Sequence, residues 1–223
     1  MVDPIQEILL NLYQKLYTSF GPQNWWPAEN TFEMMVGAIL TQNTNWINVE
    51  KTIKKLRDRN LLLVDELAEI EASKLAKLIT ACGYFNVKAN YLKSFCQWLL
   101  QETGGQVEKL FYKPLNHLRS ELLDQKGIGY ETADSILLYG GNYPIFVIDN
   151  YTKRILQRHG LITGDESYEE IRLFIENHLP EKIDLYQEFH ALIVKVASNT
   201  CKTSNPLCIE CPLENWQKIN LNI

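Results

Sequence analysis

The sequence lacks several features that would place the protein in a membrane or outside the cell. It contains no run of about 18 apolar residues, the length that a membrane-spanning helix requires. Its first residues, Met1–Ile5, lack the basic and apolar segments of a secretory signal. Low-complexity tracts are also missing, and the hydrophobic share of 46% is ordinary for a globular protein. We therefore expect a cytoplasmic protein that does not contact a membrane.

An excess of basic residues is missing too. The chain has 22 Lys and Arg against 27 Asp and Glu, which gives a net charge of −5. This net charge argues against extensive non-specific binding of nucleic acid, because such binding depends on many cations. A compact DNA site stays compatible with this charge, since backbone N–H groups and one or two cations are able to bind phosphates.

Strand-like alternation is scarce, and helical periodicity runs through nearly the whole chain. Apolar residues at i, i+3 and i+4 first appear between Ile5 and Leu16. Similar stripes lie at 31–58, 64–81, 87–102, 115–124, 131–139, 150–159, 168–178 and 184–199, most of them separated by Gly or Pro. Only Ile145–Ile148 resembles a strand, and we expect it to be a buried connector. The pattern predicts an all-α protein of about nine or ten helices.

A glycine hairpin lies between two of these helical stripes. The segment Leu123–Ala133 reads LDQKGIGYETA, with Gly127 and Gly129 on either side of Ile128. Both glycines allow positive φ and a close approach of the backbone, and Ile128 is placed to insert into the core. The following helix starts near Tyr130, so its first N–H groups face an anion such as a DNA phosphate. The alternative is a tight helix–helix turn without a ligand.

The segment resembles the helix-hairpin-helix motif of the endonuclease III superfamily of DNA glycosylases. Pro144–Arg154 is similar to the glycine/proline-rich loop and aspartate that follow this motif, and the resemblance extends from Pro27 to about Leu213. It implies a two-lobed, all-helical fold with DNA across the cleft between the lobes. Residues 28–143 then form a six-helix lobe with the hairpin at about 123–133, and residues 1–27 and 144–223 form the second lobe. We expect a monomer that binds double-stranded DNA containing a damaged base.

Asp149 is the candidate catalytic residue. It precedes an amphipathic helical stripe, so it is also a natural N-cap. In the resembled family this aspartate starts a helix and faces the flipped nucleotide. Cleavage of an N-glycosidic bond develops positive charge on the sugar, which a nearby carboxylate stabilises while it orients or deprotonates water.

The hairpin lacks the lysine that bifunctional members of the family use as a nucleophile. Glu131 stands at that position, and a carboxylate is unable to form a Schiff base. Lys126 lies on the other side of the hairpin and is no substitute. The sequence therefore predicts a monofunctional glycosylase that leaves an abasic site.

Three tryptophans form the candidate base pocket: Trp25, Trp26 and Trp46. Such residues in helical proteins are often core, and that alternative stays open. The functional alternative is a pocket that sandwiches an extruded base, with Trp25 or Trp26 acting together with Trp46. Because Trp attracts cations strongly, the pocket favours N-alkylated purines such as 3-methyladenine. The arrangement resembles the 3-methyladenine glycosylases of the superfamily.

Further residues match DNA contacts of the family. Gln42 matches the glutamine that fills the space left by the flipped nucleotide, or it is a polar helix cap. Tyr84 is the candidate wedge between bases, and Phe85 is expected to pack inward. Lys88 and Arg154 are candidate phosphate contacts, although either is equally a solvated charge. Gly127, Gly129 and Tyr130 complete the predicted DNA-binding set.

The chain has few cysteines, and three of its five lie close together. Cys201, Cys208 and Cys211 supply three of the four ligands in the family's iron–sulfur loop, whose fourth ligand is replaced by Gln217. Three alternatives stay open: a [4Fe–4S] cluster with a non-cysteine fourth ligand, a three-iron cluster, or a loop held by packing alone.

The leading hypothesis is a monofunctional DNA N-glycosylase of base excision repair that acts on alkylated purines. A rival within the same class is a glycosylase for oxidised pyrimidines or mismatched bases, and the tryptophans argue only softly against it. A rival from another class is a helix-hairpin-helix module that binds DNA without catalysis. Asp149 argues against this module, because a carboxylate facing DNA repels phosphate.

Overall fold

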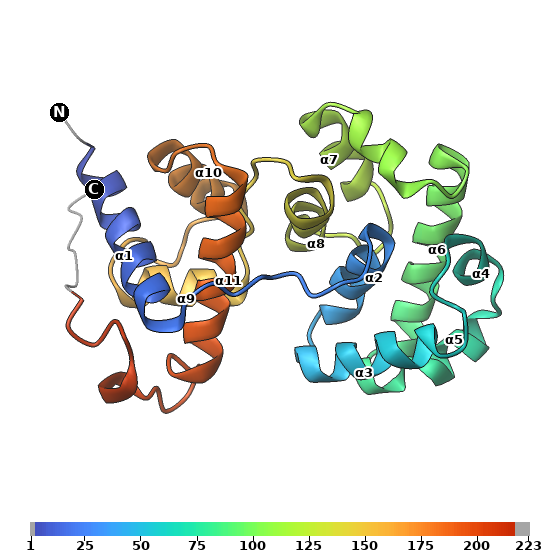
Figure 1. Cartoon of the computed structure of the whole chain (residues 1–223), viewed down its shortest axis with the longest axis horizontal. Helices are drawn as coiled ribbons and strands as arrows, with labels where there is room; N and C mark the ends of the chain where they lie inside the picture. The colour runs from blue at the N-terminus through green and yellow to red at the C-terminus, as the bar shows by residue number, and fades with distance from the viewer. Residues whose placement is uncertain (1–2, 217–223) are drawn as a thin grey trace. The chain divides into compact units, whose positions relative to one another are not determined.

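The computed structural model describes residues 3–216, which form helices and connecting segments without a strand (Figure 1). The all-α prediction is confirmed. The chain divides into two compact units, Trp26–Tyr143 and Met1–Trp25 with Pro144–Ile223. We call them the hairpin unit and the Asp149 unit. Within the described residues, no helix has both the length and the apolar composition needed to cross a bilayer.

The hairpin unit is built around α2 (Thr31–Thr41). Asn30 starts this helix by accepting a hydrogen bond from the Glu33 N–H (2.9 Å). Every residue from Phe32 to Leu40 is buried, because α2 contacts other elements on several sides. The other elements are α3 (Trp46–Arg57), α4 (Val64–Glu69), α5 (Ala72–Leu78), η1 (Thr80–Cys82), α6 (Phe85–Thr103), η2 (Val107–Tyr112), α7 (Leu115–Leu123), α8 (Tyr130–Ser135) and the π-helical turn η3 (Ile136–Gly140).

The single stripe predicted at 31–58 is two helices. Helix α2 ends at Thr41 with Gln42 as its C-cap, and the next residue, Asn43, adopts a left-handed φ of 53°. Asn45 then caps α3 by accepting from the Asn48 N–H (3.0 Å). Asn is among the residues that adopt this conformation and this cap most readily, so the break has a local cause.

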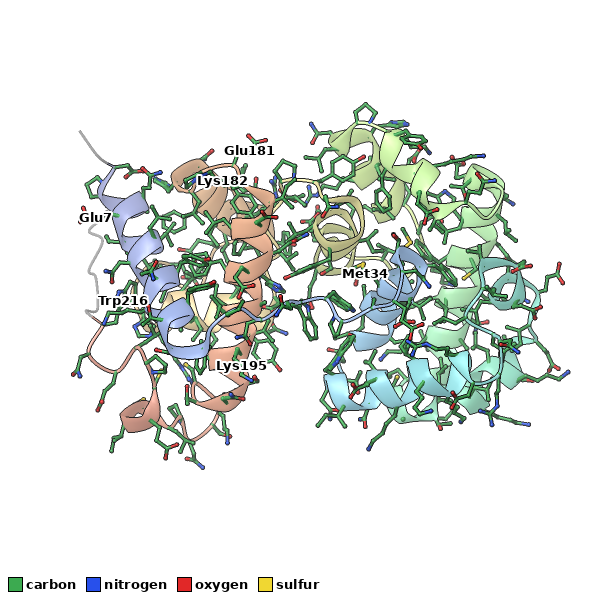
Figure 2. The ribbon with its side chains drawn as sticks, viewed as in Figure 1. Glu7, Met34, Glu181, Lys182, Lys195 and Trp216 are labelled. Carbon is green, nitrogen blue, oxygen red and sulfur yellow. The ribbon has the colours of Figure 1, made fainter. Side chains whose placement is uncertain are left out.

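The Asp149 unit contains α1 (Pro4–Phe20), α9 (Asn150–Arg158), α10 (Tyr168–His178), α11 (Ile183–Asn199) and η4 (Cys208–Glu210). The long helix α11 contacts both α1 and α9. At the end of the described chain, Trp216 returns to α1, where its Nε1–H donates to Asn11 Oδ1 at 3.0 Å (Figure 2). The C-terminal segment is thereby fixed to the first helix.

Ile145–Ile148 is an extended segment, and each of its side chains is at most 2% exposed. The Phe146 N–H donates to Glu176 Oε1 (2.8 Å), and the Phe146 ring packs against Tyr186. Because the backbone of this segment bonds to side chains rather than to a neighbouring strand, it remains a connector. This prediction is confirmed, and the connector delivers Asp149 to the start of α9.

Candidate functional site

The hairpin joins α7 to α8 through residues 124–129. The Ile128 N–H donates to the Gln125 carbonyl (3.0 Å), and the Ile128 side chain is buried. The predicted insertion of Ile128 into the core is confirmed. Tyr130 opens α8 and is 44% exposed, so it is accessible beside the hairpin.

The two hairpin glycines have different roles. Gly127 has a φ of +86°, and a Cβ there would lie 2.1 Å from Tyr91 Cδ2, so both the conformation and the space require glycine. Gly129 has an extended backbone with a φ of −95°, which corrects the expectation of positive φ at this position. A Cβ on Gly129 would meet nothing within 4 Å. The fold therefore does not require glycine at 129, and its absent side chain leaves the start of α8 open to a close-lying partner.

A buried ion pair holds the two hairpin helices together. Arg119 of α7 donates to Asp134 of α8 through Nε (2.7 Å) and Nη2 (2.9 Å), and the Asp134 side chain is fully buried. The Arg119 guanidinium also lies 5.2 Å from the centre of the Tyr130 ring. The sequence prediction missed this pair, although a charged residue within the apolar stripe 131–139 was a signal for it.

Gln42 contacts the hairpin directly. Its Nε2 donates to the Gly127 carbonyl (2.8 Å) and to Thr132 Oγ1 (3.0 Å). Gln42 also ends α2 as its C-cap residue. The amide nitrogen thus connects the end of α2 to both sides of the hairpin, and only the amide oxygen is left for an orphaned base.

Tyr84 and Phe85 are both exposed at the start of α6. Tyr84 is 71% exposed and has left-handed φ and ψ of 44° and 32°. This conformation is costly for a bulky residue, and such strain is typical of functional positions. Phe85 is 37% exposed, which corrects the expectation that it packs inward. Its position in the first turn of α6 faces solvent instead.

Lys88 and Arg154 were expected as phosphate contacts, and both have internal partners. Lys88 is 3% exposed, and its ammonium donates to the Leu40 and Cys82 carbonyls. Arg154 donates to the carbonyls of Cys201 (2.7 Å) and Ala197 (3.2 Å). Burial and its two hydrogen bonds turn Lys88 inward, which corrects the expectation for this residue. Arg154 is partly exposed and bonds to the protein through Nε and Nη2, so its phosphate contact stays a prediction.

The structure brings two of the three predicted tryptophans together. Trp26 and Trp46 meet edge to face, with ring centroids 5.3 Å apart and an interplanar angle of 88°. Tyr139 adds a third ring 5.5 Å from Trp26. Rings this close leave no gap for a base, so Trp26 and Trp46 form an aromatic corner rather than the two walls of a sandwich. Trp25 belongs to the other unit.

A pocket of about 490 Å³ opens beside the aromatic corner. Trp26 and Trp46 line it together with charged residues of α2, α3 and their flanks. Arg57 lines this pocket and pairs with Glu29 (2.7 Å) and with the buried Glu33 (2.6 Å). The charged lining residues are Glu29, Glu33, Glu50, Asp58, Lys54 and Arg57, so carboxylates outnumber cations.

Asp149 lies at the start of α9 and is 8% exposed. Its Oδ1 accepts from the Thr152 N–H (2.7 Å), so the predicted N-cap is present. Its Oδ2 lies 3.5 Å from His190 Nε2 on α11. Burial by itself would raise the pKa of Asp149, but the hydrogen bond and charge of His190 and the Thr152 N–H outweigh it and hold the pKa below its usual value. The site therefore keeps this carboxylate ionised.

His190 is a site residue that the sequence analysis missed. It is 5% exposed on α11, with its ring edge-on to Phe146. The signal was a histidine within the apolar stripe 184–199. Nothing local in the sequence reveals its partner, because Asp149 lies on a different helix.

The three C-terminal cysteines do not gather at one point. Cys201 is buried, Cys208 is exposed, and Arg158 Nη1 lies 3.1 Å from Cys201 Sγ. Within residues 3–216, no group of three Cys, His, Asp or Glu side chains is placed to hold a metal ion. The iron–sulfur loop therefore stays a prediction, and Gln217, at the expected position of the fourth ligand, lies outside the described residues. Arg158 also donates to the carbonyls of Lys202 and Thr203 in this loop.

Comparison with known proteins identifies relatives. Residues 36–181 match the model of the HhH-GPD superfamily of base excision DNA repair proteins. A provisionally named DNA repair glycosylase of Methanocaldococcus jannaschii is 41% identical over 94% of this chain and 96% of its own length. The H. pylori 3-methyladenine DNA glycosylase bound to 1,N6-ethenoadenine is 30% identical, with a TM-score of 0.73 over 87% of this chain and 95% of that one. A non-covalent endonuclease III–DNA complex has a TM-score of 0.81 at 20% identity, covering 96% of this chain and 95% of that one.

The two glycines give a matched pair of substitutions. We expect Gly127→Ala to lower the free energy of unfolding by about 1–3 kcal/mol. The new Cβ would be strained by the positive φ and would collide with the Tyr91 ring. Gly129→Ala should stay within about 1 kcal/mol of wild type, since a weaker cap and a stiffer unfolded chain oppose each other. Gly129→Ala should instead weaken duplex DNA binding. Urea unfolding and fluorescence anisotropy measure both effects, and unchanged DNA affinity in Gly129→Ala would contradict the open-backbone interpretation.

His190→Gln should raise the pKa of Asp149, because it removes the imidazole that lowers this pKa. The lowered pKa of Asp149 stabilises the fold above the unfolded-state value of about 3.9, and this stabilisation is lost as pH falls through the folded pKa. In His190→Gln both the acid limb of the pH–activity profile and the acid unfolding midpoint should therefore move to higher pH. His178→Gln is the control, since His178 faces Asp3 and Phe174 instead. An unmoved acid limb contradicts the prediction.

Proposed function

This chain belongs to the HhH-GPD superfamily of base excision DNA repair proteins and is a DNA glycosylase, and from this premise we propose that it releases alkylated purines without cleaving the strand. The observation that carries the proposal is Asp149, a buried carboxylate kept ionised at the start of α9. Its substrate is double-stranded DNA with a damaged base. Relatives have been crystallised with DNA, as in the endonuclease III complex.

In the proposed reaction the bond between the sugar and the damaged base breaks, either before water attacks the sugar or at the same time. Positive charge develops on the sugar, and the Asp149 carboxylate stabilises it and accepts a proton from the attacking water. An N-alkylated purine carries a positive charge in the strand and departs as a neutral base, so it requires no acid to protonate it. The products are the free base and an abasic site.

Strand cleavage is not part of the proposed activity. Glu131 occupies the first turn of α8, where bifunctional relatives carry a lysine, and its carboxylate has no amine to attack the sugar. Without a Schiff base, the abasic strand stays intact.

The aromatic corner supports an alkylated purine as the substrate. A cationic base is attracted to the faces of Trp26 and Trp46, and the excess of carboxylates in the adjoining pocket adds to that attraction. The likeness to the H. pylori 3-methyladenine DNA glycosylase, at 30% identity, points to the same class. A neutral oxidised pyrimidine gains neither effect.

The reaction is tested with duplexes that carry alkylated, oxidised or uracil bases, with the released bases identified by mass. We expect release of alkylated purines and no covalent adduct on borohydride treatment. Asp149→Asn should bind DNA like wild type but lose at least about a hundredfold in single-turnover rate. Asp184→Asn, an exposed carboxylate change in the same unit, is the control. A borohydride adduct contradicts the monofunctional assignment, and a wild type that releases no base favours the DNA-binding module.

Trp46→Ala tests the pocket. Loss of one stacking face should lower the release of alkylated purines about tenfold, because each base–aromatic stack contributes about 1–3 kcal/mol. Trp98→Ala is the matched control, since Trp98 packs on Phe95 and does not line the pocket. Equal loss in both variants would assign Trp46 to the core instead.

A further inference from the structure

Lys88 is a buried cation that the proposed reaction does not use. It lies in the first turn of α6 and is 3% exposed. Its Nζ donates to the Leu40 carbonyl at 2.9 Å and to the Cys82 carbonyl at 2.7 Å. Among the described residues no carboxylate forms an ion pair with it. A buried ammonium is costly, so these two carbonyls are its compensation.

Both carbonyls lie at helix ends. Leu40 is in the last turn of α2, and Cys82 is the last residue of η1. Carbonyls at helix ends lack intrahelical partners and carry the negative end of the helix dipole, so they attract a cation. Burial lowers the pKa of Lys88 and the Cys82 thiol opposes this shift. One ammonium thus holds two helix ends together.

Each of these helix ends leads directly to a candidate DNA contact. Gln42 follows Leu40 by two residues, and Tyr84 follows Cys82 by two residues. Tyr84 is exposed in a left-handed conformation, and Gln42 ends α2. The position of Lys88 Nζ therefore sets the distance between the segments that carry these two side chains.

The same part of α6 also supports the hairpin. Tyr91, three residues after Lys88, packs so closely on Gly127 that a Cβ there would lie 2.1 Å from its ring. Gln42 Nε2 in turn donates to the Gly127 carbonyl at 2.8 Å. The segment that links η1 to α6 and carries Tyr84, the end of α2, and the hairpin are therefore joined through Lys88 and Tyr91, which lie on adjacent turns of α6.

We propose that Lys88 is a positioning residue that holds Gln42 and Tyr84 in register with the hairpin, so that the three segments meet damaged duplex DNA as one rigid surface. This inference rests on the proposed glycosylase function. Extrusion of a base requires the hairpin to hold the strand while side chains occupy the opened stack, so the segments must act together. A small displacement of one segment lowers the rate without removing any contact to the sugar or base.

Lys88→Met is the test, because it keeps an unbranched side chain one atom shorter and removes the N–H donors. One duplex carries a tetrahydrofuran abasic analogue beside 2-aminopurine, whose fluorescence reports unstacking. A second duplex carries an alkylated purine and reports base release. We expect Lys88→Met to bind both duplexes within about threefold of wild type, yet to lose about tenfold or more in base-release rate and most of the fluorescence change.

Lys93→Met is the matched control. Lys93 lies on the same helix, and its ammonium donates to the carbonyls of Ile70 (2.7 Å) and Glu69 (3.3 Å) at the end of α4. It holds a helix end in the same way, but that end leads to no candidate DNA contact. We expect Lys93→Met to retain the wild-type fluorescence change and rate.

If Lys88→Met does not fold, Lys88→Gln is compared with Lys93→Gln, because an amide keeps N–H donors without the charge. The same loss in Lys88→Gln alone supports the inference. Equal behaviour of the Lys88 and Lys93 variants overturns it. If the wild-type protein gives neither base release nor a fluorescence change, the proposed function and this inference are both overturned. If the wild type is active and both Lys88 variants match its base-release rate and fluorescence change, the inference alone is overturned.

Discussion

The hairpin depends on the contact between the Tyr91 ring and the backbone of Gly127. No side chain fits between them, so the turn is fixed both by its left-handed backbone and by the ring beneath it. Other interactions use the geometry that this contact creates. Gln42 reaches the Gly127 carbonyl, and Arg119 and Asp134 pair across the two hairpin helices. A hairpin held in this way presents its outer backbone in one conformation, which favours binding because little entropy is lost.

At least five of the 22 Lys and Arg side chains bind groups of the protein itself. Lys88 and Arg119 bind buried groups, Arg57 pairs with two carboxylates that line a pocket, and Arg154 and Arg158 bond to carbonyls of residues 197–203. Few of these side chains are left to create a positive surface. If the strand is bound through backbone N–H groups at the start of α8, as the hairpin predicts, its recognition depends little on net charge.

Local patterns in the sequence were enough to predict most of the fold. The apolar stripes gave the helices, and LDQKGIGYETA with a downstream aspartate gave the hairpin and α9. Partnerships between distant segments were beyond these patterns. Lys88 looks like a surface charge in the sequence, and only the packing of α6 turns it inward. His190 and Asp134 were missed for the same reason, since each partner lies on another helix. Gly129 was assigned positive φ because the sequence does not separate a glycine required by the backbone from one required by an approaching partner.

Hydrogen bonds hold helix α9 at its start and along its later turns. Asp149 caps its start, and Arg154 and Arg158 reach from its later turns to carbonyls of residues 197–203. The segment 197–203 is thus part of the scaffold that carries the Asp149 carboxylate, even though it lies about fifty residues away in sequence. A chain cut by a protease after Asn199 would leave two guanidinium groups beside α11 without most of their acceptors. Clipping of the tail during expression or storage would therefore loosen α9, the helix that begins at Asp149, from a distance.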